Sequence, residues 1–217
     1  MQIAIGLYPE FTALDAIGPY QVLSQVPDAE VVLCAAEAGR VSDDNGLLHL
    51  EVERTFADVP TPDITLVPGG FVTRRLARDR HPIVDWLAAA HETTTCTTSV
   101  CTGALLLGAA GILDGLDATT HWFAYDELAR YGAHPTEQRV VRQGKVWTAA
   151  GVSAGIDLAL TLVAEQWGPM VSQAIQLGIE YDPQPPFDAG APSKADPEVL
   201  ALVRAISEGK EASALDG

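Results

Sequence analysis

The sequence predicts a single-domain α/β protein whose mostly parallel sheet is covered by helices on both faces. Short apolar runs typical of buried strands alternate with longer segments of helical pattern, which is the element order of this fold class. The 217 residues suffice for one domain with a sizeable core, and 47% hydrophobic against 19% charged residues is a globular composition. At residues 100–104 a β-branched run changes abruptly into a helix-forming run, as at a strand-to-helix turn.

The predicted strands are short and apolar, as expected for strands that are buried on both faces. One region has the turn residues Asp43-Asp44-Asn45-Gly46 at its centre, which indicates a small hairpin. The predicted strands are Gln2–Tyr8, Glu30–Ala36, the hairpin region Gly39–Phe56, Asp63–Val67, Thr93–Val100, and a second hairpin formed by Val140–Arg142 and Val146–Thr148.

The predicted helices begin at residues that favour helix starts. The first is interrupted at Gly18-Pro19, because proline can restart a helix at its first position. Another begins at Pro82 with Asp79 or His81 as its cap, and Ser153 caps a long apolar helix. The approximate helical ranges are Thr12–Val26, Pro82–Glu92, Ala104–Ala110, Ser153–Trp167, Pro169–Tyr181 and Pro197–Ser207.

The C-terminal part of the chain differs from the rest in its composition. Pro183-Gln184-Pro185-Pro186-Phe187 is expected to be extended, because runs of proline exclude helix. The residues after the last predicted helix are polar and are expected to fray. We therefore divide the chain into an α/β domain at residues 1–191 and a C-terminal helix with a frayed tail at residues 192–217.

The charge and the cysteines exclude several classes of protein. With 13 basic and 29 acidic residues the formal charge is −16, which repels phosphate backbones and anionic membranes, so we expect no nucleic-acid or membrane partner. Three cysteines, an odd number without framework spacing, indicate reduced thiols and a cytoplasmic setting. We find no signal peptide, membrane anchor, metal-ligand spacing or dinucleotide fingerprint, and expect neither a metal nor a cofactor.

Cys101 falls at the turn between a predicted strand and a predicted helix, which is the layout of a nucleophile elbow with sulfur in place of oxygen. This turn sets the thiol at the carboxyl edge of the sheet, where open α/β proteins bind ligands. The nearby helix N-terminus is expected to favour the thiolate. A buried structural cysteine is the alternative reading of the same position.

Gly69-Gly70 ends the predicted strand before that of Cys101, and neighbouring strands would bring the two together. Glycines can present free N–H groups toward the sulfur, although a plain turn is the alternative. Among candidate acids, Asp15 lies in an apolar helical stretch, where a carboxylate has a raised pKa. Glu10 is an alternative acid, and His121 either donates a proton, lines the pocket or is structural.

Several motifs together resemble the ThiJ/PfpI superfamily, which has a class I glutamine amidotransferase-like, flavodoxin-like fold with a nucleophile elbow. The resemblance runs from Gln2 to about Ala191. The motifs are Leu14-Asp15-Ala16-Ile17-Gly18-Pro19-Tyr20, Val67-Pro68-Gly69-Gly70, Thr98-Ser99-Val100-Cys101-Thr102-Gly103, Ala118-Thr119-Thr120-His121-Trp122, Gly155-Ile156-Asp157-Leu158-Ala159-Leu160 and Glu180-Tyr181-Asp182-Pro183-Gln184-Pro185-Pro186-Phe187.

The resemblance is greatest to the branch of this superfamily that hydrates isonitriles to N-substituted formamides without a cofactor. It implies Cys101 as nucleophile, Asp15 as general acid and base, and Thr102 as a residue that positions Asp15 or the water. Thr102 stands where protease-like members have histidine, so peptidase activity is not expected. Asp15 is one methylene shorter than the glutamate of many members. The expected substrate-binding or oxyanion residues are Gly69, Gly70, Phe71, His121 and Trp122.

The resemblance also implies a homodimer acting on a small-molecule substrate, with the active site near the subunit contact. Two other functions stay open at this point. One is a non-enzymatic ligand- or redox-sensing module, because AraC-type transcription regulators carry similar sensor domains and Cys101 could be oxidised. The other is a glyoxalase-like or deglycase-like enzyme acting on 2-oxoaldehydes, which also needs a thiol and an acid. Phe71-Val72-Thr73-Arg74-Arg75 stands where the hydratase branch has a further glycine-rich turn. The sequence therefore does not predict the shape of the pocket at this point.

Overall fold

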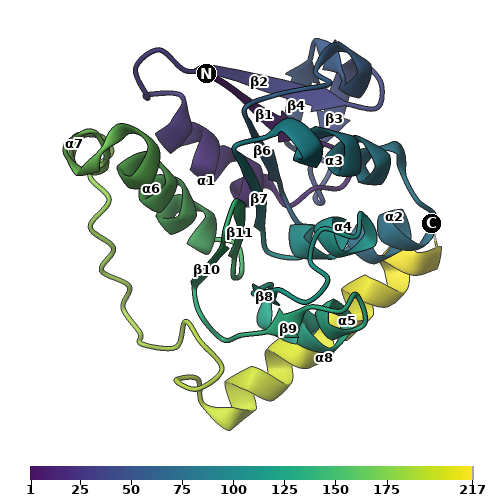
Figure 1. Cartoon of the computed structure of the whole chain (residues 1–217). Coiled ribbons are helices and arrows are strands. Elements are labelled where there is room, and N and C mark those ends of the chain that lie inside the picture. Colours follow the sequence, from purple (N-terminus) through teal and green to yellow (C-terminus); the bar gives the residue numbers. More distant parts are fainter. Residues whose placement is uncertain (217) are drawn as a thin grey trace.

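A seven-stranded sheet forms the centre of the molecule (Figure 1). The computed structural model describes the backbone of residues 1–216 and the side chains of residues 1–210 and 214. The strands, including two short pairs outside the main sheet, are β1 (Gln2–Gly6), β2 (Glu30–Ala35), β3 (Gly39–Ser42), β4 (His49–Val52), β5 (Arg54–Thr55), β6 (Ile64–Val67), β7 (Cys96–Val100), β8 (Asp117–Ala118), β9 (His134–Pro135), β10 (Val140–Gln143) and β11 (Val146–Ala149).

The strand order in the main sheet is β10-β11-β7-β6-β1-β2-β5, and only the β10–β11 pairing is antiparallel. The parallel strands β2-β1-β6-β7-β11 therefore follow the flavodoxin-like order. In this order β2 is added on one side of β1, and the later strands are added on its other side. Central strands are buried along their whole length, as the continuous apolar runs predicted. The predicted fold class and both predicted hairpins are confirmed.

Helices cover both faces of the sheet (Figure 1). One face carries α1 and α6, with α7 packed on α6, and the other carries α3 and α4, with α2 packed on α4. The helices are α1 (Ala13–Leu23), α2 (Thr73–Arg78), α3 (Pro82–Thr93), α4 (Gly103–Ala109), α5 (Tyr125–Ala129), α6 (Ala154–Trp167), α7 (Pro169–Gly178), α8 (Pro197–Asp216) and the 3₁₀ turns η1 (Phe56–Asp58) and η2 (Trp122–Ala124).

The predicted interruption of the first helix is wrong, because α1 continues through Pro19. Close packing against α6 explains this. Gly155 leaves room for the Pro19 ring, whose Cγ lies 3.0 Å from where a Cβ of Gly155 would be. Gly18 in turn faces Ile156 at the same distance. Tertiary contact therefore outweighs the cost of the backbone hydrogen bond that proline cannot make.

Other helix boundaries were predicted with mixed success. His81 is the cap of α3, with its Nδ1 accepting a hydrogen bond from the N–H of Ile83, whereas Asp79 ends α2, which was not predicted. Ser153 stands at the start of α6 but its side chain accepts instead from Arg139. The last helix was predicted to end near Ser207, but α8 continues to Asp216. Gly217 lies outside the described residues.

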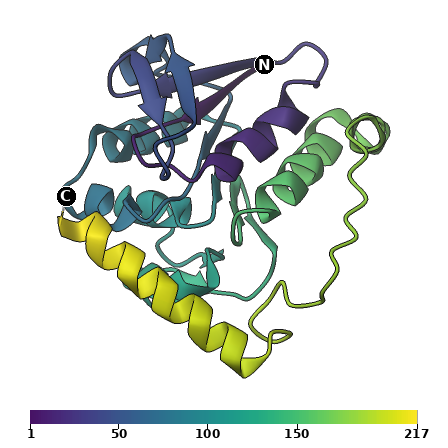
Figure 2. The ribbon, with the colours of Figure 1, turned by 180° about the vertical axis from the view of Figure 1, so that it is seen from behind.

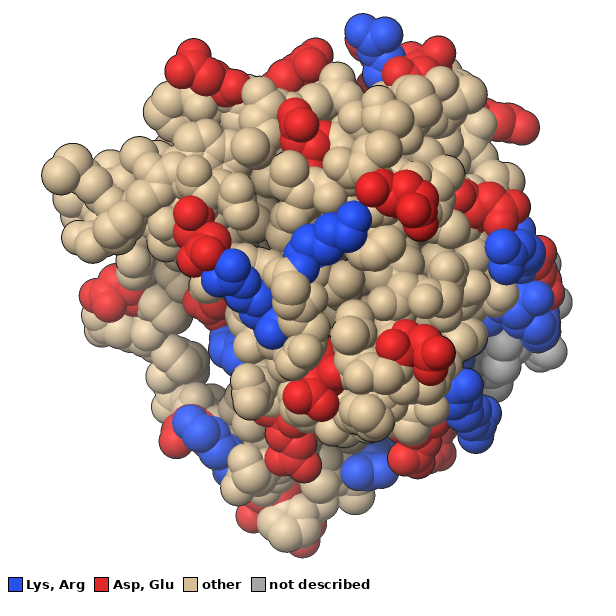
Figure 3. Space-filling model, in the orientation of Figure 1, with Lys and Arg blue, Asp and Glu red and all other residues tan. Residues whose placement is uncertain are grey.

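A long segment without helix or strand leads from α7 to α8, and its proline-rich part is extended, as predicted (Figure 2). It carries α8 back to the body of the molecule, where α8 packs near α2. Two cations of α8 lie over aromatic rings, Arg204 over Trp122 at 5.3 Å and Lys210 over Phe71 at 5.4 Å. In the described part of the chain no helix is both long and apolar enough to span a membrane. Acidic side chains are spread over the face shown in Figure 3.

Candidate active site

The carboxyl ends of β1, β6, β7 and β11 lie side by side, and the residues that follow them build the candidate active site. Cys101 follows β7 with a φ of +56°, a left-handed conformation that a non-glycine residue rarely adopts. Two turn hydrogen bonds hold it, from its N–H to the carbonyls of Ala149 and Ala150 after β11. The predicted strand-to-helix turn at Cys101 is confirmed, and the strained backbone lifts the thiol above the sheet edge.

Gly103 makes this turn possible. A Cβ there would lie 2.5 Å from the carbonyl oxygen of Val67 and 2.7 Å from that of Pro68. Such distances are well inside van der Waals contact, so the first turn of α4 can approach the end of β6 only with glycine at this position. The turn thereby brings the segment after β6, which contains Gly69 and Gly70, against Cys101.

Asp15 is fully buried near the start of α1, and its Oδ2 accepts a hydrogen bond of 2.8 Å from the N–H of Gly69. Burial raises the pKa of Asp15 to about 7, while the Gly69 N–H and the Cys101 thiol, which hydrogen-bonds the carboxylate, oppose that rise. Oδ1 has no hydrogen-bond partner of normal geometry among the described residues. A carboxyl of this kind can both release and accept a proton near neutral pH.

Cys101 is a thiol at rest, not the thiolate that the helix N-terminus was predicted to favour. Burial, with Asp15 as the second cause, raises the pKa of Cys101 well above its ordinary value. The N–H groups of Val152 and Thr102 face the sulfur and lower its pKa, but by less than burial raises it. The thiolate therefore forms only when Asp15 takes the proton, and these two N–H groups then stabilise it.

Gly69 and Gly70 do not offer free N–H groups to the sulfur, contrary to the prediction. Asp15 accepts from Gly69, and the Oγ1 of Thr102 accepts from Gly70 at 3.0 Å. The same Thr102 hydroxyl lies 3.0 Å from the carbonyl of Gly70 and donates to it. Thr102 therefore fixes the segment after β6. Its hydroxyl is hydrogen-bonded to Gly70, so it influences Asp15 only indirectly, through the neighbouring Gly69 that donates to Asp15.

A cavity of about 120 Å³ lies above the sulfur. Five predicted site residues line it, whereas Asp15 and Gly69 lie in the wall beneath and Trp122 lines a neighbouring pocket of about 510 Å³. Among the described residues, no three His, Cys, Asp or Glu side chains gather in a way that could hold a metal. The residues around the cavity are Thr12, Asp44, Gly70, Phe71, Cys101, Thr102, His121, Phe123 and Val152.

His121 is a neutral, partly buried wall of this cavity. Burial, and to a lesser degree the nearby charge of Arg74, lowers the pKa of His121 to about 4. Its ring packs on Phe123 with 4.0 Å between the centroids, and Phe123 stacks on Phe71 at 6.0 Å. An imidazole in this state is a poor proton donor at neutral pH, which agrees with a pocket-lining role. The aromatic wall suits an apolar substituent of a small ligand.

Sequence reasoning missed five residues of the site, and one of them is Phe123 of the aromatic wall. Val152 follows β11 at a turn like that of Cys101, with a φ of +25°, so the same strand-to-helix signal could have identified it. Tyr8 lies two residues after β1, which is shorter than predicted, and its hydroxyl donates to the carbonyl of Pro68 at 2.5 Å. Thr12 and Asp44 lie in loops of unremarkable composition, and only the fold brings them to the cavity.

The family model of the DJ-1/PfpI family matches residues 1–165. The chain is 43% identical over 204 residues to an isonitrile hydratase of Pseudomonas putida, covering 94% of this chain and 89% of the relative. A solved ThiJ/PfpI family protein from Pseudomonas syringae superposes with a TM-score of 0.88 at 36% identity, covering 98% of this chain and 90% of the other.

A transcriptional regulator of Pseudomonas aeruginosa, CdhR, is 29% identical over 151 residues, and the match covers 68% of this chain but only 43% of the regulator. The isonitrile hydratase and the ThiJ/PfpI protein thus match this chain over a longer stretch and at higher identity than the regulator does. The superfamily resemblance that the sequence motifs indicated is confirmed, and the chain belongs to the DJ-1/PfpI family.

Proposed function

We propose that the protein hydrates isonitriles to N-substituted formamides, with Cys101 as the nucleophile and Asp15 as the proton carrier. The observation that carries this proposal is the contact between the Cys101 thiol and a buried carboxyl whose pKa is about 7. The 43% identical isonitrile hydratase supports the same reaction. A cavity of about 120 Å³ with aromatic walls suits a small apolar isonitrile.

In the first step the thiol adds across the terminal carbon of R–N≡C. The Cys101 proton passes to Asp15, and the sulfur, held by the N–H groups of Val152 and Thr102, forms a bond to that carbon. Asp15 delivers the proton to the same carbon. The product is the thioimidate R–N=CH–S–Cys101, and Asp15 is left ionised. No proton leaves the cavity, which suits a site with little access to solvent.

In the second step Asp15 acts as a base. It takes a proton from a water whose oxygen attacks the thioimidate carbon, and the nitrogen receives that proton. The tetrahedral species expels the sulfur as the C=O bond forms, and the remaining water proton returns to Cys101. The balance is R–N≡C plus water giving R–NH–CHO. The Val152 and Thr102 N–H groups stabilise the leaving sulfur as they stabilised the attacking one.

The decisive experiment compares the wild type with Asp15→Asn on cyclohexyl isocyanide, with N-cyclohexylformamide measured by chromatography. Positioned acid–base groups contribute about 10²–10⁴-fold, and here one group serves two steps, so the loss should reach the top of that range. Asp15→Glu keeps the acid and should retain part of the activity. No formamide from the wild type would refute the function, and an undiminished Asp15→Asn would refute the mechanism.

A parallel assay addresses the 2-oxoaldehyde alternative. The wild type is given methylglyoxal under the same conditions, and lactate is measured. We expect turnover of the isonitrile and none of methylglyoxal, because the aromatic wall of the cavity suits an apolar substituent better than a small polar 2-oxoaldehyde. Lactate formation faster than formamide formation would favour the glyoxalase-like function instead.

We further propose that the protein works as a homodimer in the cytoplasm. Leu14 and Tyr20 of α1 each expose 43% of their surface. These apolar side chains are available to a second copy on the helix that also carries Asp15. The three cysteines are free thiols, as a reducing compartment would keep them. Light scattering at micromolar concentration should give the mass of two chains, and a stable monomer would refute the dimer.

A further inference from the structure

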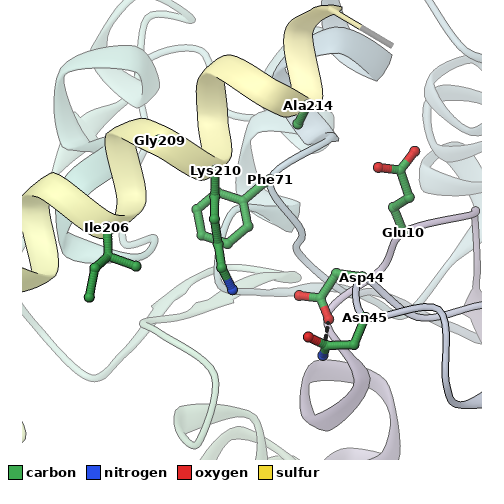
Figure 4. Close-up of a pocket in the computed structure, with 8 residues that line it drawn as sticks. All are labelled: Glu10, Asp44, Asn45, Phe71, Ile206, Gly209, Lys210 and Ala214. Carbon is green, nitrogen blue, oxygen red and sulfur yellow. Dashed lines mark hydrogen bonds between the residues drawn. The ribbon is translucent and has the colours of Figure 1, made fainter.

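Asp44 is a second carboxylate at the Cys101 cavity. It lies in the turn between β3 and β4, far from Asp15 in the sequence, and it lines the same cavity of about 120 Å³ as Cys101. It also lines a pocket of about 390 Å³ beneath α8, where Figure 4 shows it beside Asn45 and facing Lys210. Its carboxylate therefore stands between the nucleophile and the outer pocket.

The position of Asp44 is fixed from three sides. Its Oδ2 accepts a hydrogen bond of 3.0 Å from the hydroxyl of Thr12, and its Oδ1 accepts one of 2.9 Å from the amide of Asn45. Its own N–H donates to the carbonyl of Phe11 at 3.0 Å. None of these partners carries a charge, and Asp44 has no ion-pair partner among the described residues. The carboxylate is therefore held in place at the cavity, and the Lys210 side chain faces it from the outer pocket.

We propose that Asp44 is a positioning residue of the active site, which acts through Asp15 and strengthens its hold on the proton that it takes from Cys101 and passes to the substrate. This inference rests on the proton-carrying role proposed for Asp15. A second negative charge nearby disfavours ionisation of the first carboxyl, as in pairs of carboxylates that share a site. The field of Asp44 adds to burial in raising the pKa of Asp15, and it also raises that of Tyr8.

The other charged and titratable groups near Asp15 and Asp44 either face Asp15 directly or line only the outer pocket. Cys101 and Tyr8 face Asp15 from the ends of β7 and β1. Glu10 lines only the outer pocket and is paired with Arg75 at 3.0 Å. Lys210 enters the outer pocket from α8 and lies over Phe71. Glu10 therefore offers a matched control, because it carries the same charge on the same pocket but does not line the cavity.

The test is a pH titration of Asp15 by difference infrared spectroscopy, in which the band of the protonated carboxyl is identified by its loss in Asp15→Asn. The wild-type midpoint is expected at about 7. In Asp44→Asn, which keeps an acceptor for Thr12, the midpoint should fall by roughly half a unit, because one like charge is removed. Asp44→Glu should retain the wild-type midpoint, and so should Glu10→Gln.

An unchanged midpoint in Asp44→Asn, or an equal fall in Glu10→Gln, would overturn the inference. If Asp44→Asn does not fold, Thr12→Val replaces it, because loss of the hydroxyl frees the carboxylate from its position and should lower the midpoint. The titration needs no turnover. Absence of formamide from the wild type would therefore refute the proposed function alone, whereas an unchanged midpoint in an active enzyme would refute the role of Asp44 alone.

Discussion

The N–H of Gly69 donates to Oδ2 of Asp15 at 2.8 Å, so the segment after β6 holds the Asp15 carboxyl beside Cys101. There is no space between them. A Cβ at residue 69 would lie 2.6 Å from the nitrogen of Thr102 and 2.8 Å from Oδ2 of Asp15. The absence of a side chain at this one position thus sets the distance between the acid and the elbow.

Gly69→Ala should therefore inactivate the enzyme while leaving it folded. The added methyl group must displace either Thr102 or Asp15, and misplacement by about 1 Å can cost about a hundredfold in rate. Formamide production and the circular dichroism spectrum would be measured together. Gly190→Ala is the control, because nothing lies within 4 Å of a Cβ at that position. Wild-type activity in Gly69→Ala would contradict the arrangement described.

Asp15→Asn should stabilise the fold at alkaline pH. The pKa of Asp15 rises from 3.8 in the unfolded chain to about 7 in the folded protein, so the folded state binds the proton more tightly. The free energy of unfolding of the wild type therefore falls as the pH rises from about 3.8 to about 7, by about 4 kcal/mol in total. The amide of Asp15→Asn does not ionise, so the variant does not lose this stability. Urea unfolding at pH 5 and pH 8 should show an advantage of the variant that is larger at pH 8. An advantage independent of pH would contradict the burial argument.

Thr102→Val should destabilise the protein, and Thr102→Ser should not. Valine has nearly the shape of threonine but leaves the buried N–H of Gly70 without its acceptor, which costs about 1–3 kcal/mol. Serine keeps the hydroxyl that bonds both the N–H and the carbonyl of Gly70. The midpoint of urea unfolding measures the difference. Equal midpoints for the two variants would show that the hydroxyl does not hold this segment.

Iodoacetamide should modify Cys101 before Cys34 and Cys96. Cys101 lines the cavity, where the reagent can reach it and Asp15 can take its proton, whereas Cys34 and Cys96 are buried within strands and do not line that cavity. Because Cys101 is a thiol at rest, its rate should rise steeply with pH. Peptide mass spectrometry after short exposures at pH 6, 7 and 8 gives the order of labelling. Earlier modification of Cys34 or Cys96 would contradict the assignment of the nucleophile.

Local sequence was sufficient for much of the fold and for part of the site. Buried parallel strands are continuous apolar runs, and the strand-to-helix change at Cys101 is itself a local signal, so both could be predicted. The continuation of α1 through Pro19 could not, because it depends on α6, which lies more than a hundred residues away in the chain. The same holds for Asp44, which meets Cys101 only after folding.

The protonation of Cys101 was predicted wrongly for a related reason. A helix N-terminus can be identified from sequence and favours the thiolate, but burial and the neighbouring Asp15 act in the opposite direction and are stronger. The two glycines after β6 were correctly placed beside the site. The hydrogen-bond partners of their N–H groups could not be predicted. Only the folded structure shows that Asp15 accepts from Gly69 and Thr102 accepts from Gly70, in place of the Cys101 sulfur.

The outer wall of the site comes from α8, which starts at Pro197, whereas the match to the family model ends at residue 165. Cys101 and Asp15 therefore lie in the part that the family model matches, whereas one wall of the pocket beside their cavity comes from residues beyond it. Substitutions at Ile206 or Lys210 would therefore reshape the outer pocket without touching Cys101 or Asp15.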